Sequence, residues 1–263
     1  MHIIVCIKQV IDTSARIRIT DGRIDAQGSP RVVNPYDEFA LEEAIRIREG
    51  DSQSGTQVTA ISLGPESFKD VLKTALAMGA DRAIHLQDPA FEGLDNLGVA
   101  HVLALAIKKM PFDLILCGRQ AVDDDMAQVG PSLAVLLDIP FATVITGFKL
   151  SGDKSQAEIT RQVEGGSEIL EAALPLLATC QKGLNKPRLP SLKGIMAAKK
   201  KTIEVQTAAD LGFDPTNSAI SQNRIVPLEL SLPPERKKGR ILQGSQEESA
   251  ANLVRHLKDD KII

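Results

Sequence analysis

The apolar positions of the first 140 residues form short buried runs that alternate with helical patterns. Runs rich in β-branched residues predict strands over residues 2–10, 57–63, 82–86 and 113–117. Apolar residues at helical spacing predict helices over residues 35–49, 67–78, 96–109 and 126–137. Because helices connect parallel strands, this alternation predicts an α/β fold with a doubly wound, mostly parallel sheet that is covered on both faces.

Turn residues add detail to this outline. Asp21-Gly22 predicts a β-hairpin, and Asn34-Pro35 predicts a helix N-cap followed by proline at the first helical position. After Pro140, strands separated by glycine turns predict an antiparallel hairpin, and one more buried strand follows. These strands are expected over residues 142–150, 157–163, 168–172 and 175–181.

From Lys182 onward the hydrophobic periodicity weakens, and proline, lysine and glycine become frequent. A short strand is expected over 202–206 and a terminal helix over 247–258, with an extended stretch over 215–244 between them. The chain therefore divides into an α/β domain over residues 1–205 and a C-terminal arm over residues 206–263. A monomer has few ways to order such an arm, which predicts that the chain works with a partner.

Composition excludes several classes of function. The formal net charge of −3 gives no general attraction to nucleic acid or to an anionic membrane, and no apolar run approaches the length of a membrane span. Cys6, Cys117 and Cys180 are far apart, and the four histidines lack ligand spacing, so we expect buried reduced thiols and no metal site. The first strand leaves no room for a signal peptide, so a cytoplasmic protein is expected.

Ligands of open parallel sheets bind at the carboxyl ends of the strands. In this chain the candidate segments are 6–12, 34–37, 63–66 and 118–129. Gly118 permits close backbone approach at a strand exit, and the helix behind it offers N–H groups and a positive dipole end to an anion. Gln120 and Gln128 are candidates for hydrogen bonds to a ribose or a base.

The carboxylates of Asp123, Asp124 and Asp125 would repel a phosphate in this loop. Either they point away and one caps the helix, or a cation or Arg119 offsets them; a Mg²⁺ site is a further alternative. The chain contains no GxGxxG motif, P-loop or GxSxG motif. The residues thus predict a nucleotide-sized anion site without catalytic machinery, and a purely structural loop remains open.

Several ordered motifs resemble the beta subunit of electron-transfer flavoproteins, over nearly the whole chain. They are residues 8–12 (KQVID), 34–44 (NPYDEFALEEA), 74–81 (TALAMGAD), the loop 118–130, and 184–188 (LNKPR) with Leu192 and 195–201. The resemblance implies a heterodimer in which an alpha subunit holds the redox-active FAD. The beta subunit binds AMP structurally in most members, and a second, redox-active FAD in an electron-bifurcating, NADH-oxidising branch.

The resemblance also implies which residues hold the nucleotide, with no catalytic residue in this chain. By motif match they are Cys6, Asn34, Pro35, Tyr36, Asp37, Leu63, Gly118, Arg119, Gln120, Ala121, Val122, Asp123, Asp124, Asp125, Met126, Ala127, Gln128 and Val129. Bifurcating members tend to have glycine where this chain has Asp124, whose side chain narrows the site. Residues 127–131 nevertheless look like the bifurcating form. AMP is expected, and a second FAD is the alternative.

The resemblance finally suggests partners. Leu192 matches the tip of a loop that docks on acyl-CoA or other flavin dehydrogenases, and the electron acceptor would be a quinone-reducing oxidoreductase. The C-terminal arm would wrap the alpha subunit. An adenine-nucleotide sensor of the universal-stress type shares the α/β layout, but a compact sensor needs no such arm. Lys199, Lys200 and Lys201 are either solvated surface or a guide for an acidic partner.

Overall fold

The computed structural model describes residues 1–25, 27–51, 55–217, 223–234, 239 and 241–263. Its chain separates into two compact units. The first contains residues 1–17 and 25–228, and the second contains residues 18–24 and 229–263. The boundary thus lies beyond residue 205, because Leu211 and Phe213 are buried in the core of the first unit and the ring of Phe213 packs edge-on against Phe91.

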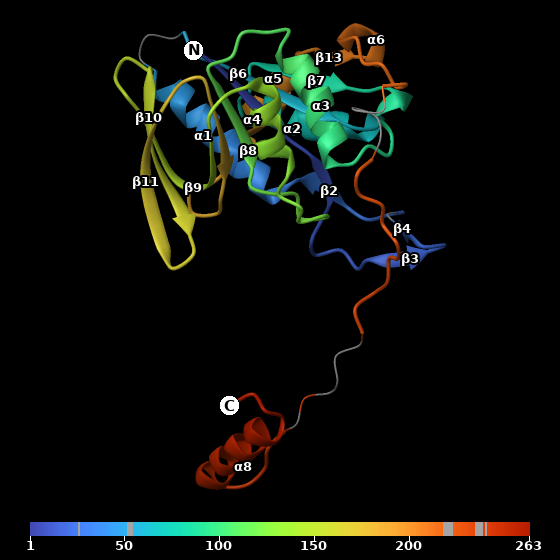
Figure 1. Cartoon of the computed structure of the whole chain (residues 1–263), viewed down its shortest axis with the longest axis vertical. Helices are drawn as coiled ribbons and strands as arrows, with labels where there is room; N and C mark the ends of the chain where they lie inside the picture. Colours follow the sequence, from blue (N-terminus) through green and yellow to red (C-terminus); the bar gives the residue numbers. More distant parts are fainter. Residues whose placement is uncertain (26, 52–54, 218–222, 235–238, 240) are drawn as a thin grey trace. The chain divides into compact units, whose positions relative to one another are not determined.

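The first unit is built on a nine-stranded sheet in the order β11-β10-β9-β12-β8-β1-β6-β7-β13 (Figure 1). Six neighbouring pairs are parallel, and only β9-β10 and β10-β11 are antiparallel. The predicted α/β fold is therefore confirmed. The strands of this sheet are β1 (His2–Cys6), β6 (Gln57–Leu63), β7 (Arg82–Leu86), β8 (Leu114–Gly118), β9 (Phe141–Leu150), β10 (Gln156–Val163), β11 (Gly166–Ala173), β12 (Leu176–Cys180) and β13 (Ile203–Gln206).

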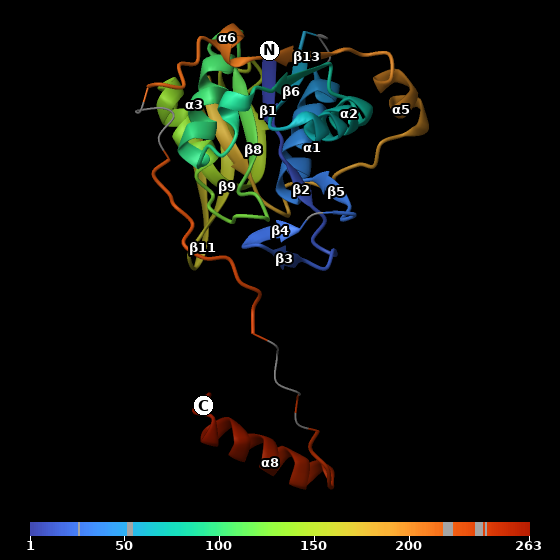
Figure 2. The same cartoon turned by 90° about the vertical axis from the view of Figure 1, so that its right-hand side faces the viewer.

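Helices cover both faces of the sheet. Figure 2 shows α3 (Asn96–Ile107) on one face, and α1 (Pro35–Gly50) and α2 (Lys69–Met78) on the other. Side chains of β1 alternate between two cores: Ile3 and Val5 join the core under α1 and α2, whereas Ile4 and Cys6 join the core under α3. A strand that is buried on both faces needs the continuous apolar run that the sequence shows. Across the described ranges, none of the helices combines the length and apolar character needed to cross a membrane.

Smaller elements complete the first unit. They are β2 (Gln9–Ile11), which pairs with β5 (Arg31–Val33), the 3-10 helices η1 (Glu66–Phe68) and η2 (Pro89–Phe91), and the helices α4 (Val129–Leu137), α5 (Leu192–Ala198) and α6 (Ala208–Leu211). Two predictions need correction here. The first predicted strand is divided into β1 and β2, and residue 192 begins helix α5 instead of lying in a loop.

The second unit contains the hairpin of β3 (Arg18–Thr20) and β4 (Arg23–Asp25), apart from the last residue of β4, together with the terminal helix α8 (Gln246–Asp259). Asp21 and Gly22 both adopt positive φ angles, 51° and 69°, as the predicted tight hairpin turn requires. Helix α8 begins with a capping box between Ser245 and Glu248. None of the side chains of α8 is buried.

Candidate functional site

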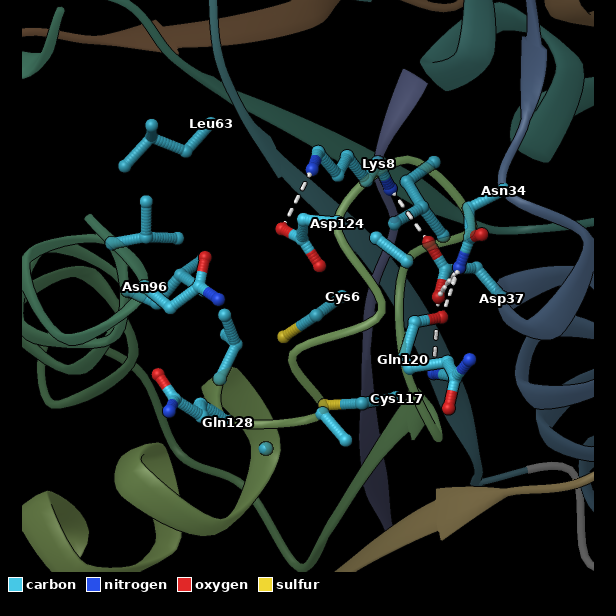
Figure 3. Close-up of a pocket in the computed structure, with 18 of the residues that line it drawn as sticks. Cys6, Lys8, Asn34, Asp37, Leu63, Asn96, Cys117, Gln120, Asp124 and Gln128 are labelled. Atoms are coloured by element: carbon cyan, nitrogen blue, oxygen red, sulfur yellow. Dashed lines mark hydrogen bonds and ion pairs between the residues drawn. The ribbon is translucent and has the colours of Figure 1, made fainter. Parts of the chain in front are cut away.

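A pocket lies where the carboxyl ends of β1, β6 and β8 meet (Figure 3). Strand β1 has β6 on one side and β8 on the other, so successive strands are added on opposite sides of β1. Ligands of such folds bind at this switch point in the strand order. The cavity volume is about 160 Å³. One water needs only about 15 Å³ of such space, so the pocket is much more than a packing defect.

The two sides of the pocket differ in chemistry. Asn96 and Gln128 lie on one side, and Asn34, Asp37 and Gln120 lie on the other (Figure 3). Apolar side chains and two thiols also line the pocket: Cys6, Ile61, Leu63, Val99, Leu103 and Cys117. An apolar slot with a few convergent amides is suited to a flat heteroaromatic ring.

Buried Asp37 connects three segments at the mouth of the pocket. Its carboxylate accepts hydrogen bonds from the backbone N–H of Lys8 at 2.7 Å, the backbone N–H of Gly118 at 3.0 Å and the Asn34 amide at 2.9 Å. Burial raises the pKa of Asp37 to about 7, and these hydrogen bonds oppose that rise. Asp37 therefore fixes the exits of β1 and β8 relative to α1.

Asn34 extends this arrangement to the loop 119–128. Its amide nitrogen donates to the carbonyl of Gln120 at 2.9 Å, and its amide oxygen accepts from the N–H of Val122 at 3.1 Å. The predicted N-cap position is confirmed, but the side chain makes no cap hydrogen bond because it holds the loop instead.

A cation pairs with two of the carboxylates of the loop, which is one of the alternatives that the sequence left open, and this cation is Lys8. Nζ of Lys8 lies 2.8 Å from Oδ1 of Asp123 and 3.3 Å from Oδ2 of Asp124. The guanidinium of Arg119 instead lies over the ring of Tyr36, with 5.5 Å between its carbon and the ring centroid. One ammonium between two carboxylates reduces the electrostatic repulsion of an anion at the mouth of the pocket, compared with the repulsion expected from the sequence alone.

Helix α4 begins at Val129, three residues later than predicted. Asp124 accepts a hydrogen bond from the N–H of Met126 at 3.0 Å, and Asp125 and Ala127 have positive φ angles of 52° and 55°. This local turn competes with helix formation, so the first free N–H groups of α4 belong to Val129 and Gly130, both in the pocket wall.

All three cysteines are free and buried, as expected. The hydrogen bond with Cys6 and burial raise the pKa of Cys117 well above its ordinary value, so Cys117 remains a neutral thiol. Among the described residues, no group of three or more His, Cys, Asp or Glu is arranged to hold a metal ion.

Comparison with known proteins identifies the family. Residues 21–211 match the model of the electron transfer flavoprotein domain. Over its full length, and over the full length of each relative, the chain is 43% identical to an electron transfer flavoprotein subunit beta of Thermoanaerobacterium thermosaccharolyticum and 42% identical to one of Bacillus subtilis. The chain belongs to the electron transfer flavoprotein beta-subunit family. It is also 39% identical, with both chains fully covered, to the caffeyl-CoA reductase-Etf complex subunit CarD of Acetobacterium woodii.

The pocket lining brings together twelve of the residues implied by the motifs. They are Cys6, Asn34, Asp37, Leu63, Gly118, Arg119, Gln120, Ala121, Asp124, Ala127, Gln128 and Val129. Pro35, Tyr36, Val122, Asp123, Asp125 and Met126 lie beside the pocket and are not part of its lining. Nine further lining residues were not assigned to the site: Ile7, Lys8, Ile61, Phe68, Asn96, Val99, Leu103, Cys117 and Gly130, of which only Ile7 and Lys8 lie in a candidate segment, 6–12. Most of these are apolar, and no sequence signal separates an apolar lining residue from a core residue.

Proposed function

We propose that the protein is the beta subunit of a heterodimeric electron transfer flavoprotein, binding AMP structurally in the pocket and docking partner dehydrogenases. Electrons then pass to the FAD of an alpha subunit. The observation that carries the proposal is the pocket at the switch point, with amides and apolar groups in its lining and Lys8 among the acidic side chains at its mouth. Membership of the beta-subunit family supports the same role.

The lining fits a mononucleotide. Val99 and Leu103, one turn apart on α3, would contact one face of an adenine ring. The amides of Asn96 and Gln128 would serve as hydrogen-bond partners for its edge or for the ribose. The N–H groups of Val129 and Gly130 at the start of α4 would bind a single phosphate. In this arrangement the nucleotide ties α3, α4 and the loop 119–128 together and so stabilises the fold.

Asp124 favours the shorter ligand. It lines the pocket and shares Lys8 with Asp123, so two carboxylates face one ammonium. A dinucleotide would bring a second phosphate toward this excess negative charge and toward the space that the side chain fills. AMP avoids both penalties.

The chain would contribute no catalytic residue of its own to electron transfer. It would supply the fold, the structural nucleotide and a docking surface, while the alpha subunit supplies the flavin. Acyl-CoA or other flavin dehydrogenases would donate electrons, and a quinone-reducing oxidoreductase would accept them. In the second unit, the exposed Leu253 and Val254 of α8 and Ile262 beyond it are apolar groups that an alpha partner would cover.

Leu192 provides the test of the docking role. Its side chain is 76% exposed, so replacing it removes little packing within the chain. In a heterodimer with its alpha partner, Leu192→Ala is expected to raise the KM for the dehydrogenase about tenfold, as truncation of an interface anchor does. The measurement is FAD reduction by the dehydrogenase under steady-state conditions, with bound nucleotide and thermal melting recorded in parallel.

The matched control is Ile169→Ala, because Ile169 of β11 is also an exposed apolar residue of the first unit, at 71%, and lies outside both the docking region and the C-terminal arm. It should leave the KM unchanged. An unchanged KM for Leu192→Ala, or failure of the chain to form a heterodimer with an alpha subunit, would contradict the proposed function.

A further inference from the structure

The residues around Leu192 form an exposed apolar patch on the first unit. Leu189, Leu192, Ile195 and Met196 are exposed by 89%, 76%, 41% and 61%. We call residues 189–196 the docking segment. A patch of flexible apolar side chains binds a partner weakly unless its backbone is already ordered, because binding must otherwise supply the cost of ordering it. The contacts that order this backbone therefore bear directly on docking.

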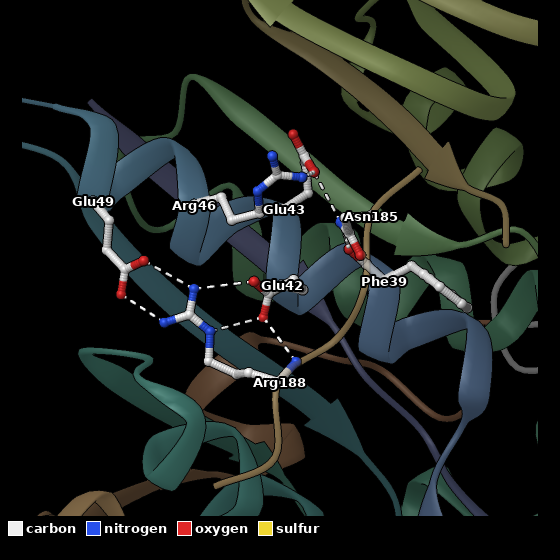
Figure 4. A network of polar contacts seen from close by, with 7 residues as sticks. All are labelled: Phe39, Glu42, Glu43, Arg46, Glu49, Asn185 and Arg188. Atoms are coloured by element: carbon white, nitrogen blue, oxygen red, sulfur yellow. Dashed lines mark hydrogen bonds and ion pairs between the residues drawn. The ribbon is translucent and has the colours of Figure 1, made fainter. Parts of the chain in front are cut away.

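Arg188 ties the start of the docking segment to helix α1 (Figure 4). Its guanidinium donates to both carboxylate oxygens of Glu42, at 2.8 and 3.0 Å, and to both oxygens of Glu49, at 2.6 and 2.8 Å. Its backbone N–H donates to Glu42 as well, at 3.1 Å. These contacts with Glu49 and Glu42 raise the pKa of Arg188, so it is always charged. The planar guanidinium of arginine can pair with both oxygens of each carboxylate, whereas the ammonium of lysine cannot make these paired hydrogen bonds.

Asn185 strengthens the same attachment. Its amide nitrogen donates to the carbonyl of Phe39 at 2.9 Å and to the carboxylate of Glu43 at 2.8 Å (Figure 4). The chain between β12 and the docking segment is therefore held at two points along α1.

Helix α5 seats the other end of the docking segment on α2. A Cβ atom at Gly194 would overlap the carbonyl oxygen of Ala77, so glycine permits this close approach of the two helices. Beyond α5, Nζ of Lys201 donates to the carbonyl of Ala80 at 2.7 Å. The backbone that carries the exposed apolar residues is therefore attached to α1 at one end and to α2 at the other.

We propose that Arg188 is a positioning residue for dehydrogenase docking: its forked contacts with Glu42 and Glu49 hold the docking segment in its binding-competent arrangement. This inference rests on the proposed docking function of Leu192. Arg188 itself need not contact the partner, since it acts through the order that it imposes on residues 189–196.

The test is Arg188→Lys in the heterodimer, which keeps a positive charge beside the buried Glu42 and removes the fork. We expect the KM for the dehydrogenase to rise about tenfold, kcat to stay within about twofold, and amide hydrogen exchange of residues 189–196 to accelerate. Bound nucleotide should be unchanged. The matched control is Arg161→Lys, because Arg161 of β10 also pairs with a glutamate, Glu168 of β11, at 3.8 Å, and neither residue takes part in the attachment of the docking segment.

The double variant Arg188→Met with Glu42→Met distinguishes loss of positioning from a folding defect, because it leaves no unpaired buried charge at residue 42. It should reproduce the rise in KM. If both Arg188 variants leave the KM unchanged, or lower only the melting temperature, the positioning role is overturned. Leu192→Ala distinguishes failure of this inference from failure of the proposed docking function. If Leu192→Ala raises the KM and the Arg188 variants do not, only the positioning role of Arg188 is contradicted. If neither substitution raises the KM, the docking function itself is contradicted.

Discussion

Gly118→Ala is expected to lower the melting temperature of the heterodimer by several degrees and to reduce the nucleotide that it retains. A Cβ atom at residue 118 would overlap Oδ1 of Asp37 and lie 2.8 Å from the Asp37 backbone nitrogen and from the Tyr36 carbonyl carbon. These neighbours include backbone atoms that no side-chain rotation can move. Overpacking of this kind costs about 1–3 kcal/mol and would displace the hydrogen bond from Gly118 to Asp37.

Gly152→Ala is the matched control, because a Cβ atom there meets no atom within 4 Å. Melting curves and the nucleotide released from each purified variant give the measurement. A Gly118→Ala variant with wild-type melting and full nucleotide content would show that the contact between the β8 exit and α1 does not shape the pocket.

Lys8→Met is expected to weaken AMP binding by about tenfold to a hundredfold. The substitution removes the ammonium that lies between Asp123 and Asp124 and leaves both carboxylates without an ionic partner at the pocket mouth. Two partly exposed carboxylates left unpaired near a phosphate repel it by about 1–3 kcal/mol, which corresponds to the expected loss of affinity. Isothermal titration of the nucleotide-stripped heterodimer with AMP measures the effect.

Two further variants sharpen this experiment. Lys69→Met is the control, because Lys69 forms a comparable ion pair with Glu66 and is not part of the pocket lining. Asp124→Gly should act in the opposite direction and relax the site toward longer nucleotides, since it removes one carboxylate and its bulk. Equal AMP affinity of wild type and Lys8→Met would contradict the electrostatic role of Lys8.

Much of the parallel sheet follows from the sequence. Strands β6 and β7 begin and end where predicted, because each is a short, mostly apolar segment followed by turn residues. The insertion of β12 between β8 and β9 did not follow, because an apolar run shows that a strand is buried but not which strands it pairs with. That pairing is decided by the packing of the whole sheet.

The candidate site, like the sheet, was predicted from the sequence only in part. Loop 118–129 was found because glycine at a strand exit followed by a helix has a direct physical meaning. The partner of Asp123 and Asp124 was not found, since Lys8 is 115 positions away from Asp123 and only the sheet order brings them together. The late start of α4 also escaped prediction, because it depends on a hydrogen bond from the N–H of Met126 to Asp124.

The most direct test of the proposed function is to denature the purified heterodimer and identify the released nucleotides by chromatography. The pocket, with Asp124 in its wall, predicts one FAD and one AMP per heterodimer, and a single flavin in reductive titration. Two FAD per heterodimer and no AMP would contradict this account and place the protein in the electron-bifurcating branch.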